Sequence, residues 1–243
     1  MIRKEEIAVC INGLARDNYE HALKNTHKMF PYDTFYMHWS NRQKPNVPNC
    51  LYVDEPVYDY HNILETKTKP DCPLWRKYKE KLKRKPGLWQ TTKDNSKQIL
   101  SHYYLVNSLP ARYKTIIRLR YDLIVSTRVD FTPYMEMAQE GLVVGFGGSK
   151  VGLNVPPPFL SRHSHHDCRR CTGWMIWDHM FFHPRDRLKN VEKLYKERDL
   201  LGAEFGLYQV LCHQWGDKNY INVEGGTILT KHCTAPREEW SKL

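Results

Sequence analysis

The sequence predicts an α/β fold, a single domain over residues 1 to 243 with a mostly parallel central sheet. Short apolar runs rich in β-branched residues alternate along the chain with longer segments of helical spacing. Glycines and prolines separate these runs, and no internal repeat is evident. With 243 residues, of which 41% are hydrophobic, the chain is long enough to bury one large core.

The N-terminal part predicts a strand, a tight turn, a helix and a second strand. Residues 7 to 11 (Ile-Ala-Val-Cys-Ile) are apolar and end at Asn12-Gly13, and residues 17 to 30 carry helical spacing. Pro31 ends this helix, and residues 34 to 39 form the second predicted strand. Because crossover connections are right-handed, the two strands are expected to be parallel neighbours.

Further elements follow in the same alternation. A third strand at residues 50 to 53 lies within a variable basic insertion, residues 41 to 88, which is rich in Pro, Asn and Lys. Beyond it the pattern predicts a helix over 90–109, strands over 112–125, 142–148 and 174–182, and helices over 187–198 and 203–215.

The formal net charge of +10 admits nucleic acid, an anionic membrane surface or a phosphorylated small molecule as a partner. Residues 75 to 85 hold seven cations in eleven positions, a pattern most typical of a solvated helix face or loop. One alternative function is therefore a nucleic-acid-binding module that uses the 76–85 stretch with Trp75 and Tyr78. Confinement of the cations to one insertion argues against it.

Seven cysteines form an odd set, and the N-terminus carries no signal-peptide pattern. No apolar run approaches the roughly 20 residues that a membrane span needs. A soluble, cytoplasmic protein is expected. Ser241-Lys242-Leu243 matches a peroxisomal address, and a three-residue match of this kind is interpreted as chance.

The strand over 112–125 delivers Arg118, Arg120 and Asp122 to one edge of the predicted sheet. Working polar residues of nucleotide-handling α/β enzymes lie where buried strands end. An Arg-Asp ion pair at a strand end is the alternative interpretation of the same residues.

Several motifs together resemble small nucleotide-sugar glycosyltransferases of the WavE-like, capsular and lipopolysaccharide type, which also occur in large DNA viruses. In order they are Ile7 to Arg16 with Phe35-Tyr36-Met37-His38-Trp39, a helix with Gln90 and Ser96, Ile117-Arg118-Leu119-Arg120-Tyr121-Asp122, Asp178-His179-Met180-Phe181-Phe182, and Ala203-Glu204-Phe205. The resemblance spans residues 5 to about 230, with the insertion outside it. It implies a GT-A-type fold, a single Rossmann-like α/β/α domain.

The resemblance also implies an activity, the transfer of a hexosyl or pentosyl group from a nucleotide-diphosphate sugar to a hydroxyl of a glycan or glycoprotein acceptor. Such an enzyme needs positive charge at the diphosphate and a carboxylate near the acceptor. The implied donor-binding residues are Gly13, Arg16, Arg118, Arg120 and Asp122, and the implied catalytic base is Asp178 or Glu204. Trp174 and Trp177 would stack on the acceptor sugar, with core packing as their alternative role.

A divalent cation, Mn²⁺ or Mg²⁺, is the implied cofactor, held by Asp122 and by a C-terminal histidine, His232 or else His213. The usual GT-A pattern has an aspartate two positions before the second one, where this chain has Arg120. Arg120 could assist a metal at Asp122, or it could replace the metal by contacting phosphate directly.

A competing motif lies at residues 163 to 171, where five His and Cys side chains stand in nine positions and include the pair in Cys168-Arg169-Arg170-Cys171. This spacing could close a small structural Zn²⁺ site, which would make the chain a zinc-stabilised interaction protein. No second Cys-x-x-Cys pair accompanies it, so a mobile acceptor loop is the preferred interpretation.

Overall fold

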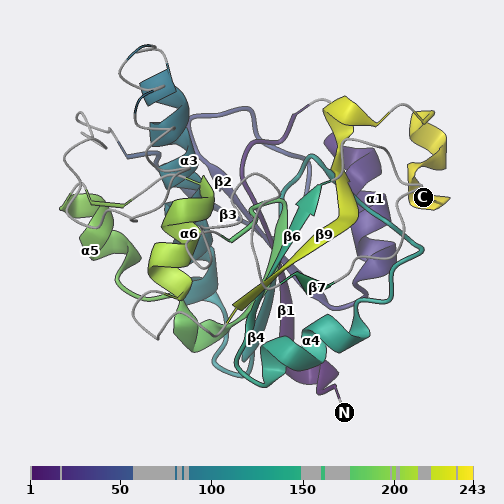
Figure 1. Cartoon of the computed structure of the whole chain (residues 1–243). Coiled ribbons are helices and arrows are strands. Elements are labelled where there is room, and N and C mark those ends of the chain that lie inside the picture. The colour runs from purple at the N-terminus through teal and green to yellow at the C-terminus, as the bar shows by residue number, and fades with distance from the viewer. Residues whose placement is uncertain are drawn as a thin grey trace.

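A central sheet with helices on both faces forms the molecule (Figure 1). The computed structural model describes residues 2–16, 18–56, 80, 84, 88–148, 160–161, 176–197, 199–200, 203–212, 220–233 and 235–242. The strands are β1 (Ile7–Asn12), β2 (Asp33–Trp39), β3 (Cys50–Val53), β4 (Thr115–Leu119), β5 (Leu123–Val125), β6 (Val143–Gly148), β7 (Leu160–Ser161), β8 (Met180–Pro184) and β9 (Tyr220–Leu229).

The sheet follows the order β3-β2-β1-β4-β8-β6-β9-β5, with β7 paired to β9. Strand β1 is parallel to both β2 and β4, and β2 is parallel to β3. Strand β8 is antiparallel to β4 and β6, while β6 is parallel to β9. Strands β1, β2, β3, β4, β6 and β9 therefore point one way, and the predicted α/β fold with a mostly parallel sheet is confirmed.

Among the residues that the structure describes, five α-helices cover the two faces: α1 (Tyr19–Met29), α3 (Leu88–Ser108), α4 (Thr132–Gln139), α5 (Val191–Lys196) and α6 (Ala203–Leu211). Helices α3, α5 and α6 lie on one face, and α1 and α4 lie on the other (Figure 1). Short 3-10 turns occur at Lys4–Glu6, Arg185–Arg187, Thr230–His232 and Arg237–Lys242.

Alternation along β1 divides the core into two layers. Ala8 and Cys10 pack into the cluster that contains the buried residues of α3, whereas Ile7, Val9 and Ile11 join the cluster that contains those of α1 and α4. Successive side chains of a strand point to opposite faces, so a strand covered on both faces must be apolar throughout. All six residues of β1 are buried, which explains its unbroken apolar run.

The single strand predicted over 112–125 is wrong, because the chain forms two strands with a break at residues 120 to 122. Strand β4 continues the parallel sheet, whereas β5 pairs with β9 in antiparallel fashion. Strand β9 also pairs with β6. Within β9, Gly225 and Gly226 have positive φ and form a bulge between Glu224, which pairs with Gly147, and Thr227, which pairs with Gly148. The break leaves the charged side chains of Arg120 and Asp122 at the edge of the sheet.

Other element boundaries also differ from the sequence prediction. Residues 176 to 179 approach the sheet through a single bridge at Asp178, and regular pairing begins only at Met180. The helix predicted over 187–198 begins at Val191, after a 3-10 turn. Helix α4 was not predicted, although Pro133 in its first turn and the buried Tyr134, Met135 and Ala138 give its signal.

Within the described residues, no helix is both long and apolar enough to cross a membrane.

A buried histidine pair joins α3 to β8. The Nε2 atoms of His102 and His183 lie 2.9 Å apart, and both residues have 0% exposure. The backbone carbonyl of Pro184, 2.8 Å from Nδ1 of His183, can only accept a hydrogen bond, so His183 donates from Nδ1 and accepts at Nε2 from His102. Burial lowers the pKa of His183 to about 4 and lowers that of His102 well below its usual range.

Acid is expected to destabilise the folded protein through this histidine pair. The unfolded imidazoles take up protons near pH 6.5, whereas the folded ones resist protonation until about pH 4, so the free energy of unfolding falls as pH drops through that window. The slope approaches about 1.4 kcal/mol per pH unit for each histidine. Denaturant unfolding between pH 4 and 7 measures it.

The double variant His102→Gln/His183→Gln should lose most of this slope. His232→Gln, at an exposed position, serves as the matched control and should keep it. If the free energy of unfolding of the double variant changed with pH as that of the wild type does, the histidine pair would not be the cause of the loss of stability in acid.

Candidate active site

Polar side chains gather at the carboxyl ends of β1 and β4, which are adjacent parallel strands. Residues 13 to 16 leave β1 here, and residues 120 to 122 leave β4. Gly13 has a φ of +122°, a conformation that favours glycine, and a side-chain Cβ built there would meet nothing within 4 Å. The turn after β1 therefore keeps its backbone open to a ligand at the edge where α/β folds bind them.

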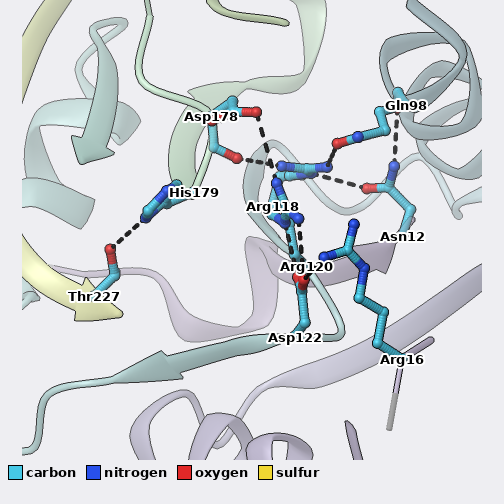
Figure 2. Close-up of polar contacts among 9 residues, drawn as sticks. All are labelled: Asn12, Arg16, Gln98, Arg118, Arg120, Asp122, Asp178, His179 and Thr227. Atoms are coloured by element: carbon cyan, nitrogen blue, oxygen red, sulfur yellow. Dashed lines mark hydrogen bonds and ion pairs between the residues drawn. The ribbon is translucent and has the colours of Figure 1, made fainter. Parts of the chain in front are cut away.

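Arg120 and Asp122 form a bidentate ion pair in this edge (Figure 2). Nε of Arg120 donates to Oδ1 of Asp122 at 2.8 Å, and Nη2 donates to Oδ2 at 3.1 Å. Tyr121 between them has 0% exposure and stacks on Tyr36 inside the core. The turn at residues 121 and 122 thus buries Tyr121 while Arg120 and Asp122, on either side of it, face one another.

Asp122 is almost completely buried, with only 3% of its side chain exposed. Burial opposes its ionisation, but the charge of Arg120, the hydrogen bonds from Arg120 and the charge of Arg16 outweigh burial and lower its pKa. Nη1 of Arg16 lies 3.6 Å from Oδ2 of Asp122, and half of the Arg16 side chain is exposed. Asp122 thus stays charged and is enclosed by two guanidinium groups.

Arg118 differs from the expectation that it binds a ligand, because it is 2% exposed and fully engaged. Its Nε donates to Oδ1 of Asn12 at 3.1 Å, and its Nη2 donates to Oε1 of Gln98 at 3.3 Å. Its Nη1 donates to the backbone carbonyl of Asp178 at 2.6 Å. Its guanidinium also lies over the ring of Phe181. Arg118 therefore connects β1, α3 and the approach to β8 from inside the protein.

Asp178 lies beside Arg120, with its Oδ2 3.9 Å from Nη1 (Figure 2). Its side chain is 18% exposed, so it lies at the border between the interior and solvent. The next residue, His179, approaches the hydroxyl of Thr227 at 3.5 Å through its Nδ1. Burial lowers the pKa of His179, so a neutral imidazole stands beside the charged cluster.

Glu204, in the first turn of α6, is partly buried in the same cluster. Burial and then the charge of Asp178 raise its pKa to about 8, against a smaller lowering from its own backbone N–H and from Arg120. The backbone N–H of Ile176 donates to the carbonyl of Glu204, which holds the start of α6 against the residues before Asp178. A carboxyl group whose pKa lies near neutrality suits proton transfer.

Trp177, the predicted acceptor platform, is partly buried. Its ring lies directly against Gly147, where any larger side chain would collide with it, and its backbone N–H donates to Oδ1 of Asn222 at 3.1 Å. Packing therefore accounts for one face of the ring. Trp174, His213 and the zinc-competent stretch 163–171 lie outside the described residues, as does the basic stretch 76–85 except for Glu80 and Arg84.

The residues do not fit a divalent cation at Asp122. Both carboxylate oxygens of Asp122 are hydrogen-bonded to Arg120, and Arg16 lies close to one of them. His232, the predicted second ligand, is exposed in the 3-10 turn Thr230–His232. In the part of the chain that the structure describes, no group of three or more His, Cys, Asp and Glu side chains is arranged to hold a metal ion.

A cavity of about 500 Å³ opens beside Arg16, in the turn between β1 and α1. Its lining includes the cations Arg16, Lys44 and Arg237 and the ring of Tyr19. The hydroxyl of Tyr19 accepts a hydrogen bond of 2.7 Å from the backbone N–H of Asn46, which fixes the ring at the cavity wall. The cavity thus combines positive charge with an aromatic surface, a combination suited to a nucleotide.

A second cavity, of about 750 Å³, lies at the opposite end of β4, near Lys114, Arg185 and Lys189. It is larger than the cavity beside Arg16, but it lies away from Arg120, Asp122 and Glu204. Since ligands of parallel α/β sheets bind at the carboxyl ends of the strands, the candidate site is the one at Arg16.

Sequence reasoning did not identify several residues of this site. Asn12 and Gln98 accept the hydrogen bonds of Arg118, and His179 lies beside Asp178. Tyr19 and Lys44 line the cavity and come from segments that carried no motif. A polar Asn12 ending an otherwise apolar strand was the one local signal, since a buried polar residue needs a partner.

Arg118→Met is expected to destabilise the protein, because it leaves the buried acceptors of Asn12, Gln98 and Asp178 without a donor. The cost should be at least about 2 kcal/mol in the free energy of unfolding. Arg112→Met is the matched control, since the Arg112 side chain is 63% exposed and its partners, Asp33 and the hydroxyl of Tyr113, lie at the other end of β4. Denaturant unfolding compares the two, and an equal, small effect of both would disprove the connecting role of Arg118.

No protein-family model matches the chain, and no curated protein matches it. Several solved structures resemble the chain at low sequence identity, among them the three described next. The 4-diphosphocytidyl-2C-methyl-D-erythritol synthase of Anaerococcus prevotii is 10% identical, over 91% of this chain and 90% of that one, with a TM-score of 0.45. A glycosyltransferase involved in glycosylation of the major capsid of PBCV-1 is 10% identical over 97% of both chains, with a TM-score of 0.38.

Mannose-1-phosphate geranyltransferase of Thermus thermophilus is 13% identical, over 93% of this chain and 75% of that one, with a TM-score of 0.39. Likeness at this level does not identify an activity for this chain.

Proposed function

We propose that the chain is a glycosyltransferase that moves a sugar from a nucleotide-diphosphate donor to a hydroxyl of a glycan acceptor. One observation supports this most directly. The guanidinium group of Arg120 lies beside two carboxyl groups, Asp178 and Glu204, at the carboxyl edge of the sheet. The exposed Arg16 stands at the same edge, where it lines a cationic cavity. Transfer of a sugar needs both functions, positive charge for the leaving diphosphate and a base for the acceptor.

In this proposal the nucleoside occupies the cavity beside Arg16, with Tyr19 and Lys44 at its wall. The diphosphate then extends toward Arg120, which lies between Asp122 and Asp178. The sugar lies beyond the diphosphate, next to Asp178 and Glu204. The order of groups in the donor thus matches the order of side chains along the edge.

The reaction proceeds as a displacement at the anomeric carbon. A carboxylate, Glu204 or Asp178, takes the proton of the acceptor hydroxyl as its oxygen bonds to that carbon. The bond from the carbon to the phosphate oxygen breaks, and its electron pair leaves with the nucleoside diphosphate. The guanidinium groups stabilise the charge that develops on the diphosphate, where a fixed cation contributes most.

Screening UDP-, GDP- and dTDP-sugars by thermal shift and calorimetry tests the proposal, and at least one donor should raise the melting temperature by linkage. If none of them binds, with or without Mn²⁺, the proposal fails.

Arg16→Gln should weaken donor binding about tenfold, the effect of losing one charge-assisted contact with phosphate. Half of this side chain is exposed, so its removal should leave the melting temperature of the free protein almost unchanged. Calorimetric titration with the best donor measures the affinity. Arg112→Gln, at the other end of β4, is the control. An equal loss of donor affinity in both variants would mean that Arg16 acts through the overall positive charge of the protein and not through contact with the donor.

Glu204 should set the pH dependence of the reaction. A base must be ionised, so kcat/KM is expected to rise with pH through about 8 and then level off, and Glu204→Gln should lower the rate and remove this rise. The raised pKa also means that the contribution of Glu204 to the free energy of unfolding falls as pH increases from 4.5 to about 8, opposite in sign to that of the histidine pair, and Glu204→Gln should remove this contribution. A wild-type profile in Glu204→Gln would assign the base to Asp178.

A further inference from the structure

We infer that the diphosphate of the donor is neutralised by the guanidinium groups of Arg16 and Arg120 without a divalent cation, and that Asp122 is a positioning residue for Arg120. The inference rests on the proposed function, whose donor it concerns. It differs from the arrangement that the sequence resemblance implied, in which Asp122 holds a divalent cation.

The carboxylate oxygens of Asp122 are buried and already hydrogen-bonded. A carboxylate that binds a metal must offer an oxygen lone pair toward open space. Asp122 is 2% exposed, and Nε and Nη2 of Arg120 hold its two oxygens at 2.8 and 3.1 Å. Burial leaves a cation little access to the remaining lone pairs of these oxygens, and displacing Arg120 would break a bidentate pair, one of the strong forms of hydrogen bonding in proteins.

Electrostatic repulsion is the second argument. A divalent cation at Asp122 would stand within a few ångströms of the Arg120 guanidinium and of Nη1 of Arg16, which is 3.6 Å from the carboxylate. Like charges this close in a partly buried site repel strongly. Arg118, also buried beneath the site, adds a third guanidinium group to the same region.

The chemistry of Arg120 is the third argument. Its position, two residues before Asp122, orients both side chains to the same side, so the carboxylate fixes the plane of the guanidinium. Hydrogen bonding and charge raise the pKa of Arg120 despite its burial, so it remains a permanent cation. A planar, fixed guanidinium matches the geometry of phosphate oxygens, which is the task a metal ion performs in other transferases.

Arg16 would complete the anion site from the other side. Its guanidinium touches Asp122 and also lines the cavity proposed for the nucleoside. The two cations come from the ends of adjacent parallel strands, β1 and β4, so both approach a diphosphate that lies across this edge. Three guanidinium groups stand against Asp122, Asp178 and Glu204, and the raised pKa of Glu204, about 8, keeps it protonated at neutral pH. The region is therefore positive there, which favours an anion over a cation.

The first test measures the affinity of the full chain for UDP and GDP by calorimetry, in EDTA and in Mn²⁺. The wild type should bind at least one of the two equally well in both conditions. Manganese EPR, without nucleotide, should detect no bound Mn²⁺. Binding that requires Mn²⁺ would overturn the inference and leave the proposed function intact, whereas no binding under either condition would overturn both.

Variants at Arg120 sharpen the test. Arg120→Met should weaken diphosphate binding about tenfold to a hundredfold, and Arg120→Lys should recover part of it. Arg120→Asp places a second carboxylate two positions before Asp122, so this variant should bind Mn²⁺ by EPR and bind UDP or GDP only when Mn²⁺ is present. Arg112→Met is the matched control and should bind as the wild type does.

Asp122→Asn distinguishes positioning from metal binding. It should weaken diphosphate binding equally in EDTA and in Mn²⁺, because Arg120 loses its orientation, and Asp122→Glu should restore part of the affinity. If Asp122 were a metal ligand, Asp122→Asn would instead abolish a Mn²⁺-dependent part of the binding. Thermal melting of each variant confirms that the comparison is made between folded proteins, and the wild-type measurements decide the question if a variant fails to fold.

Discussion

The buried guanidinium of Arg118 holds the site together from beneath. A charge in the interior is tolerated only when hydrogen bonds satisfy it, and here acceptors from β1, α3 and the segment before β8 supply them. Burial still lowers the pKa of Arg118 to about 10, which measures how far the surroundings disfavour the charge. Strand β4, helix α3 and the backbone of Asp178 are consequently fixed relative to one another at the point where the polar edge begins.

From this interior charge the cluster extends outward in steps of decreasing burial. Arg118 is 2% exposed, the side chains of Arg120 and Asp178 are 16% and 18% exposed, and half of Arg16 is accessible. Asp122 lies between the guanidinium groups of Arg16 and Arg120, and Arg120 lies between Asp122 and Asp178. Such an arrangement changes little when an anion binds, which is the preorganisation that stabilises a charged leaving group.

Much of the fold followed from local patterns in the sequence. The apolar runs of β1 and β2 and the helical spacing between them predicted parallel neighbours, because those signals are local and crossovers are right-handed. The break between β4 and β5 was not predictable from the same run, since the buried Leu119, Tyr121 and Leu123 continue the alternation of a single strand across it. Strand β5 instead pairs with β9, residues 220 to 229. Pairing over that sequence distance depends on the tertiary fold.

For the site, the sequence by itself determined that Arg16, Arg120, Asp122, Asp178 and Glu204 follow or precede buried elements, since alternation and spacing fix where a strand or helix ends. Only the tertiary structure decided their partners. Arg118 and Arg120, two residues apart in one run, could equally have faced a ligand, but Asn12 and Gln98 bury the first and Asp122 fixes the second at the edge. The reason is physical: hydrogen bonds and desolvation depend on neighbours that lie as many as 106 residues away in the chain.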